Sequence, residues 1–173
     1  EPGDKILISG PIAAHGIAVL SVRDGLEFGS DIVSDTAPLN RIIREVLDAG
    51  IQVSMMRDPT RGGVAATLNE IAHASGHGIV ITERAVPVAD DVRAACAFLG
   101  LDPLLVANEG RVVMFVRPDD ADHALQILGD DNPGAAIIGS VVADHPGVVV
   151  ARTGIGGTRV VDLPLAEQLP RIC

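Results

Sequence analysis

The chain has 173 residues, of which 47% are hydrophobic but only 2% aromatic, and its formal net charge is −10. A chain of this length and apolar content folds around a buried, mainly aliphatic core, which excludes intrinsic disorder. With 13 Lys and Arg residues against 23 Asp and Glu residues, no basic cluster and no long apolar run, the composition also excludes a nucleic-acid-binding face and a membrane-spanning helix.

In chain order, the pattern of apolar residues and turns predicts a strand at 5–9, helices at 11–22 and 38–49, a strand at 51–56, a helix at 63–75, a strand at 79–82, a helix at 90–99, a strand at 111–116, a helix at 119–128 and strands at 136–142, 148–151 and 159–162. The helix at 38–49 has the clearest periodicity. Thr36 or Asp35 is placed to cap its start, and Gly50 is placed to end it.

Interleaved helices and strands predict an α/β (α+β) fold. We expect a single domain over residues 1–163, with a mixed sheet of six to seven strands and four to five packing helices. Residues 164–173 contain two prolines and little periodicity, so they are expected to form a mobile tail. Two cysteines, Cys96 and Cys173, are too few for a disulfide scaffold, which favours a reducing cytoplasm.

The segment 57–63 turns from a strand through two glycines into a helix. Free N–H groups at the start of a helix attract phosphate, and Arg57 and Arg61 are able to add charged contacts. The segment lacks the spacing of a Walker loop or a dinucleotide fingerprint. From the spacing alone, a tight turn followed by a helix N-cap is the favoured interpretation, and a phosphate site is the alternative.

Two further side chains are candidates for proton transfer. Glu109 lies in the polar run Asn-Glu-Gly-Arg before a strand, where a carboxylate serves as a general base, as a metal ligand or simply as a solvated loop acid. His15 lies in apolar sequence, where a lone histidine is more often a partly buried residue than a catalyst. His73 and His77 have helical spacing, but Gly76 ends the helix between them, so we expect no zinc site and no other metal site there.

The last residue of the chain is Cys173. A thiol at the end of a ten-residue tail reaches on the order of 33 Å when extended, which suits a carrier group. Arg171 favours its thiolate, whereas the terminal carboxylate opposes it. The alternative is a chance residue at a fraying end. Cys96 lies among alanines in a predicted helix and is expected to be a small core residue.

Taken together, several motifs resemble those of a known family. They are Gly3-Asp4, Ser34-Asp35, Asp58-Pro59-Thr60-Arg61-Gly62-Gly63, Asn108-Glu109-Gly110 and the terminal Pro170-Arg171-Ile172-Cys173. By these motifs the chain resembles the HypE family of hydrogenase-maturation proteins, within the PurM-like superfamily of aminoimidazole ribonucleotide synthetase and selenophosphate synthetase. The resemblance runs along the whole chain but covers only the C-terminal half of the family's proteins.

The resemblance implies a PurM C-terminal-domain-like fold and a two-step chemistry on Cys173. A partner carbamoyltransferase (HypF) places a carbamoyl group on the thiol, and ATP then activates the amide oxygen as a phosphate ester. Loss of phosphate leaves a thiocyanate, and the iron-scaffold proteins HypC and HypD receive the cyano group for the iron of [NiFe] hydrogenase.

The resemblance also implies roles for single residues. Cys173 is the nucleophile and carrier, Glu109 assists proton removal, and His15 orients the tail. Arg171 steers or binds the tail. The residues that border the nucleotide phosphates are Asp58, Thr60, Arg61, Gly62 and Gly63.

The family's N-terminal half supplies most ATP and Mg²⁺ ligands and much of a homodimer interface. It is expected to precede Glu1, because the sequence begins without an initiator Met. We therefore expect this chain alone to bind ATP weakly, to turn over little and to self-associate through an orphaned apolar surface. The alternatives are another PurM-like ATP-dependent synthetase or kinase domain, and a non-catalytic module that presents its C-terminal tail to partner proteins.

Overall fold

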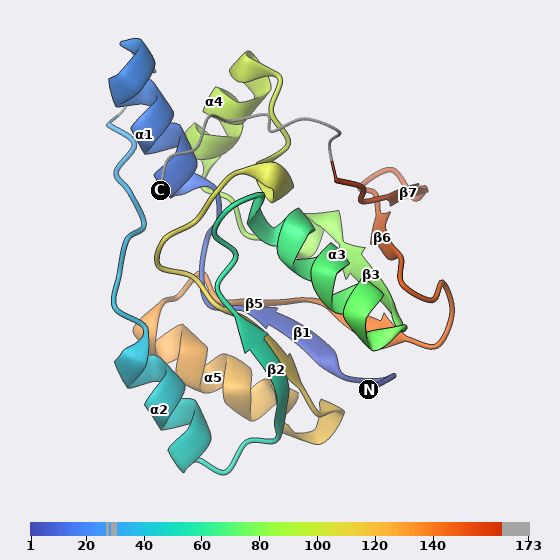
Figure 1. The fold of residues 1–173 in the computed structure, drawn as a ribbon. Coiled ribbons are helices and arrows are strands. Elements are labelled where there is room, and N and C mark those ends of the chain that lie inside the picture. The colour runs from blue at the N-terminus through green and yellow to red at the C-terminus, as the bar shows by residue number, and fades with distance from the viewer. Residues whose placement is uncertain (27, 29–30, 164–173) are drawn as a thin grey trace.

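The computed structural model describes residues 1–26, 28 and 31–163. One seven-stranded sheet runs through the centre (Figure 1), with the strand order β2-β4-β1-β5-β3-β6-β7. Its strands are β1 (Lys5–Ile8), β2 (Val53–Arg57), β3 (Gly78–Thr82), β4 (Val113–Val116), β5 (Ala136–Val142), β6 (Val149–Arg152) and β7 (Thr158–Val160). Neighbouring strands are antiparallel except β3 and β6, which are parallel, so the predicted mixed sheet is confirmed.

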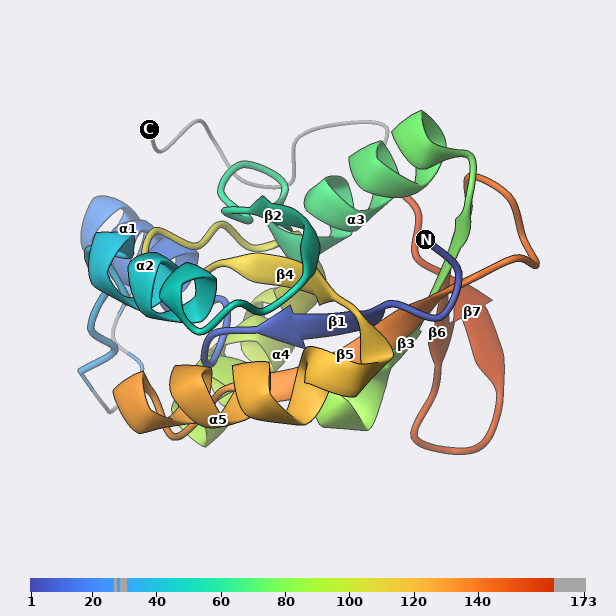
Figure 2. The same cartoon turned by 90° about the horizontal axis from the view of Figure 1, so that it is seen from below.

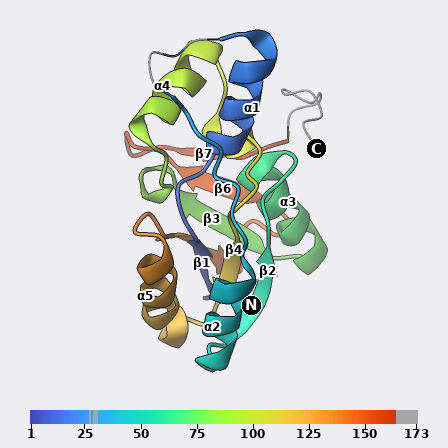
Figure 3. The same cartoon turned by 90° about the vertical axis from the view of Figure 1, so that its left-hand side faces the viewer.

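Five α-helices pack around this sheet: α1 (Ala14–Asp24), α2 (Asn40–Asp48), α3 (Gly63–Ser75), α4 (Asp90–Leu99) and α5 (Ala121–Asp131). Figure 2 shows α3 and α5 on opposite faces of the sheet. The helices α2 and α5 contact each other, as do α1 and α4, which lie together beyond one end of the sheet (Figure 3). Three 3₁₀ turns, η1 (Glu83–Ala85), η2 (Pro103–Leu105) and η3 (Pro118–Asp120), complete the described part. The first two were not predicted, and η3 overlaps the start of the helix predicted at 119–128.

Strand alternation divides the core between the two faces. Ile6 and Ile8 pack with α3, whereas Leu7, between them, packs with α2 and α5. On β4, Phe115 belongs to the first cluster and Met114 to the second. All five side chains are buried. The central strands are therefore mainly apolar on both faces, because both faces of the sheet are covered.

Most predicted elements are confirmed within two or three residues at each end. The helix predicted at 11–22 begins only at Ala14, because Ala13 has a left-handed backbone with φ 75°. The predicted cap of α2 is wrong: Leu39 occupies the N-cap position and no side chain caps the helix. The aspartates of 90–91 lie in the first turn of α4, but the N-cap is Ala89, also without a side-chain cap.

The predicted packing role of Cys96 is confirmed, since 1% of its surface is exposed and it lies in the core beside Ala95. Burial raises the pKa of the Cys96 thiol to about 11. No helix in the described residues combines the length and the hydropathy required to cross a bilayer.

Candidate functional site

The strand directions bring the predicted site loops to one edge of the sheet. Both β1 and β2 run antiparallel to β4, so they run parallel to each other. Their carboxyl ends therefore lie beside the amino end of β4. The chain that leaves β1 at 9–16, the chain that leaves β2 at 58–63 and the chain that enters β4 at 108–112 meet at this edge.

Asn108 ties these three segments together. Its side chain is 1% exposed. The Oδ1 atom accepts a hydrogen bond from the Ala13 N–H at 2.7 Å, and the Nδ2 group donates to the carbonyl oxygens of Pro59 at 2.9 Å and Val106 at 3.1 Å. All the bonding groups of this buried amide reach main-chain partners, and a network with this degree of satisfaction holds its loops in one arrangement.

Gly62 and Gly63, the N-cap and the first residue of α3, lie in different surroundings. Both have left-handed backbones, with φ 70° for Gly62 and 64° for Gly63. Gly62 is exposed, whereas Gly63 is buried. A Cβ at Gly63 would lie 2.5 Å from the carbonyl oxygen of Leu104, so this position accepts only glycine because η2 lies against it. The surface open to an anion is therefore the part of the loop before Gly63.

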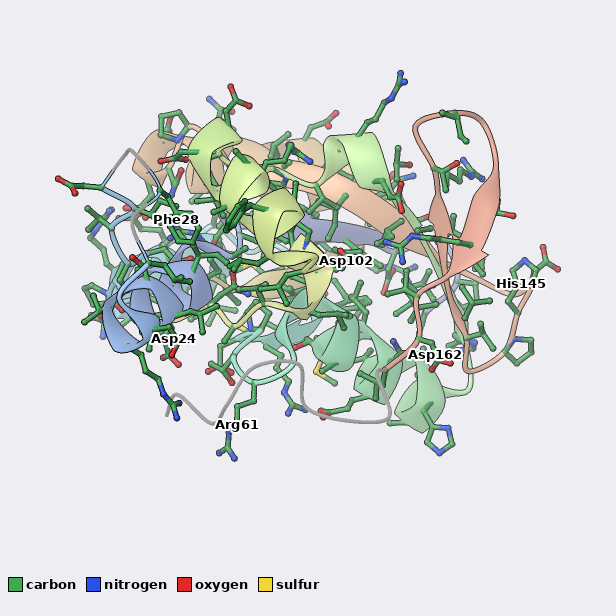
Figure 4. The ribbon with its side chains drawn as sticks, turned by 90° about the horizontal axis from the view of Figure 1, so that it is seen from above. Asp24, Phe28, Arg61, Asp102, His145 and Asp162 are labelled. Atoms are coloured by element: carbon green, nitrogen blue, oxygen red, sulfur yellow. The ribbon has the colours of Figure 1, made fainter. Side chains whose placement is uncertain are left out.

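The loop before Gly63 carries the cationic side chain of Arg61, and it leads into a helix without a side-chain cap. No side chain caps the first turn of α3, so its N–H groups carry partial positive charge. Arg61 is exposed and projects away from the body of the protein (Figure 4). Arg57, in contrast, forms an ion pair with Glu70 of α3, with 2.7 Å between Nη1 and Oε2. Asp58 is exposed and Thr60 is half-buried.

Glu109 follows Asn108 in the same loop and is half-buried. Its main-chain N–H donates to Oδ1 of Asp35 at 3.3 Å. Asp35, which lies 74 residues earlier in the chain, thus holds the main chain at Glu109. Asn108, the residue before Glu109, donates to the Pro59 carbonyl and so joins this loop to the one before α3, a contact that the sequence did not predict.

His15 lies in the first turn of α1 and is half-buried. Its Nδ1 atom is 2.9 Å from Oγ of Ser34, and that hydroxyl is 2.7 Å from Oγ1 of Thr36. Asp35, one of the two residues predicted to cap the helix at 38–49, instead accepts the Glu109 N–H, and its neighbour Ser34 bonds His15. Asp35 and Asn108 were not among the predicted site residues, although both stand in the family motifs.

Arg171 and Cys173 lie outside the described residues, so their predicted roles stay predictions. The described residues contain no group of three or more His, Cys, Asp or Glu side chains able to hold a metal ion. Among the adjacent aspartates at 119–120 and 130–131, Asp120 accepts the N–H of Gln52 at 2.9 Å and Asp131 pairs with Arg41. The site therefore combines a carboxylate, an imidazole and a loop with an exposed arginine before an uncapped helix, residue types that are suited to proton transfer beside a phosphate.

The chain is similar in sequence to a family of known proteins. Residues 1–152 match the family described as AIR synthase related protein, C-terminal domain. The carbamoyl dehydratase HypE of Rhizobium leguminosarum bv. viciae is 53% identical over 176 residues, which cover 100% of this chain and 50% of that protein. The chain thus spans about half the length of the curated relatives it matches.

Solved structures of similar sequence have the same fold. A crystal structure of the hydrogenase maturation protein HypE in complex with ATP superposes with a TM-score of 0.93 at 46% identity, covering 100% of this chain and 53% of that one. The crystal structure of a HypE–HypF complex gives a TM-score of 0.90 at 46% identity, covering 95% of this chain and 54% of that one.

Proposed function

The chain belongs to the AIR synthase related proteins as their C-terminal domain, and on that basis we propose that it serves an ATP-dependent carbamoyl dehydratase that makes the cyanide ligand of [NiFe] hydrogenase. The observation that carries the proposal is the 53% identity to a carbamoyl dehydratase over the whole chain. The meeting of Glu109, His15 and the loop before α3 at one sheet edge supports it, because the reaction needs a proton acceptor beside a phosphate.

The chemistry converts a carbamoyl group on the Cys173 sulfur into a nitrile. The carbamoyl oxygen attacks the γ-phosphorus of ATP, so that an O–P bond forms and ADP leaves. The C–O bond then breaks with release of inorganic phosphate, both N–H protons are lost, and a C≡N bond remains on sulfur. An amide oxygen leaves poorly unless it is phosphorylated, which explains the need for ATP.

The residues of this chain hold the reacting group and accept protons. Glu109, half-buried and fixed through its main chain, takes an N–H proton during loss of phosphate. His15 orients the tail, and Arg171 guides it. Asp58, Thr60, Arg61, Gly62 and the start of α3 at Gly63 border the phosphates, where N–H groups and a guanidinium stabilise developing negative charge.

ATP binding needs more than this chain supplies. The described residues offer a loop for phosphate and no group of three or more His, Cys, Asp or Glu side chains able to hold a metal ion. Following the family resemblance, we assign most of the metal ligands to the region of the relatives that lies outside the match. Isothermal titration of this chain with Mg-ATP should therefore show weak binding. A micromolar dissociation constant would contradict this assignment.

We propose a carbamoyltransferase of the HypF type as the donor to Cys173, supported by the solved HypE–HypF complex. HypC and HypD are the proposed acceptors of the cyano group. A homodimer of the longer protein and a cytoplasmic location complete the proposal, since a reducing compartment keeps Cys173 a free thiol.

The carrier role is tested by mass spectrometry after incubation with the carbamoyltransferase, carbamoyl phosphate and ATP. The unaltered chain should gain one carbamoyl group, and Cys173→Ala should gain none. Cys96→Ala is the matched control and should be modified like the unaltered chain, because the buried Cys96 thiol stays protonated at neutral pH. Stoichiometric modification of Cys173→Ala would exclude the carrier role.

Mixing the chain with the remaining region of the R. leguminosarum relative distinguishes the enzyme from the alternatives. We call this mixture the reconstituted protein. ATP hydrolysis that depends on carbamoylated Cys173 supports the dehydratase. Partner binding without turnover supports a module that presents its tail, and phosphorylation of a small molecule without need of Cys173 supports another synthetase or kinase.

A further inference from the structure

Asp35 is one of the few buried polar residues of the described part, although it lies in an extended segment between α1 and α2. Its side chain is 2% exposed, whereas the next residue, Thr36, is exposed. Burying a carboxylate costs several kcal/mol unless charged or hydrogen-bonding groups surround it. The groups that surround Asp35 therefore indicate what it stabilises.

Those groups belong to the loop that carries Glu109. Oδ1 of Asp35 accepts the Glu109 N–H at 3.3 Å, and Oδ2 lies 3.8 Å from Nε of Arg111. The main-chain oxygen of Asp35 lies 3.5 Å from Nη1 of the same arginine. Asp35 thus contacts the residue before and the residue after Gly110.

Arg111 is anchored on its other sides as well. Its Nε group donates to the carbonyl oxygen of Pro11 at 2.7 Å, and Nη1 donates to that of Gly110 at 2.7 Å. Burial lowers the pKa of Arg111, while the charge of Asp35 opposes this shift. The guanidinium remains charged at neutral pH and needs the carboxylate as its counterion.

Gly110 shows how closely the two segments pack. A Cβ at this position would clash with the carbonyl oxygen of Asp35 and lie 2.5 Å from the main-chain nitrogen of Ala37. The loop around Glu109 therefore rests directly on the main chain at 35–37. The neighbouring Ser34 hydroxyl meets Nδ1 of His15 at 2.9 Å, so the same segment contacts the side chain of His15 and the main chain of Glu109.

We propose that Asp35 is the positioning residue of this site, whose buried carboxylate holds the main chain at Glu109 and the guanidinium of Arg111 and so places the Glu109 carboxylate for proton removal. This inference rests on the proposed function. A displacement of about 1 Å at a reacting group lowers a rate by up to about a hundredfold, so the loss of this contact affects turnover more than nucleotide binding.

The test compares Asp35→Asn with Asp4→Asn in the reconstituted protein. Asp4 is also buried beside an arginine but lies at the other end of β1, so it is a matched control. Asp35→Asn should lower kcat by about tenfold to a hundredfold and leave the KM for ATP within about twofold. Asp4→Asn should leave kcat within about twofold, although it lowers the thermal stability.

A double variant shows whether Asp35 acts through Glu109. Glu109→Gln should remove most of the activity, and Asp35→Asn added to it should lower kcat no further, since both changes disable the same proton transfer. Amide exchange in the chain itself gives a readout without catalysis. The Glu109 amide should exchange about tenfold faster in Asp35→Asn, with the amide of Leu7 in β1 unchanged.

The outcomes separate the two proposals. Full kcat in a folded Asp35→Asn variant, with Glu109→Gln inactive, would overturn the positioning role and leave the proposed function intact. If the unaltered reconstituted protein makes no thiocyanate from carbamoylated Cys173, the proposed function fails and the positioning role in it fails as well. If Asp35→Asn does not fold, Arg111→Lys replaces it and should lower kcat in the same way, because lysine lacks the planar fork that Arg111 uses.

Discussion

A buried aspartate stands beside an arginine at each end of β1, but the two pairs hold different parts of the chain together. At the amino end, Oδ2 of Asp4 accepts the Ser54 hydroxyl at 2.6 Å, and Oδ1 lies 3.5 Å from Nη1 of Arg117. Every one of these residues lies in or directly beside the strands β1, β2 and β4. The pair therefore fastens neighbouring strands of the sheet.

At the carboxyl end, Asp35 belongs to no helix or strand, and its partners are the main chain of Glu109 and the side chain of Arg111. This pair fastens loops. A carboxylate that joins strands adds to stability alone, whereas one that joins loops also sets the position of the side chains between them. The difference indicates that the contacts at the carboxyl ends of β1 and β2 position the side chains of the loops as well as stabilising the fold.

Of the changes at the two ends of β1, Asn108→Ala should lower the free energy of unfolding the most. The change leaves the Ala13 N–H and the carbonyl of Val106 without their buried partner, and each such loss costs about 1–3 kcal/mol, so we expect the free energy of unfolding to fall by about 4 kcal/mol. Urea unfolding measures it. Asn69→Ala is the control: the Asn69 amide bonds two carbonyls but is only half-buried. An equal loss of unfolding free energy in both variants would contradict the special role of Asn108 in joining the loops at the carboxyl end of β1.

Gly110→Ala should have the second largest effect on stability. The added methyl group meets the carbonyl oxygen of Asp35, so the backbone must shift. Overpacking of this kind costs about 1–3 kcal/mol. At the opposite end, a Cβ at Gly3 approaches nothing closer than 3.9 Å, so Gly3→Ala carries only the backbone strain of φ 101°. Thermal unfolding should show the larger loss for Gly110→Ala, and the reverse order would refute the close packing of the two loops.

Asp4→Asn should have the smallest effect on stability at neutral pH. It should also change how the stability depends on pH in the acidic range. Burial acts to raise the pKa of Asp4, but the Ser54 hydroxyl, the ammonium group of Glu1 and the Arg117 guanidinium hold it below its usual value. A carboxyl whose folded pKa is lowered stabilises the protein above its unfolded pKa of about 4 and loses this contribution as the pH falls further.

Unfolding free energies measured from pH 6 down to pH 3 test this expectation. The unaltered chain should lose more stability over this range than Asp4→Asn, which has no such carboxyl to protonate. Parallel curves for the two proteins would show that Asp4 is not held in its charged form.

Local pattern was enough to predict most of the elements. The ends of α3 and β5 agree with the periodicity and with the glycine at position 76, because helix ends and strand alternation depend on neighbouring residues. The prediction failed where a distant partner decides. Asp35 is of a residue type that often caps helices, yet its carboxylate accepts the main-chain N–H of Glu109, 74 residues away.

The sequence by itself was enough to predict the aliphatic core and the α/β fold with a mixed sheet, because composition and short-range spacing carry this information. It also singled out residues 58–63 and Glu109 as candidates, whose chemistry stays a prediction. Only the tertiary structure decided that these loops meet. The meeting follows from β1 and β2 both pairing with β4, and from Asn108 and Asp35 joining loops that lie far apart in the chain. Contacts of this kind arise from strand order and close packing, which no local pattern encodes.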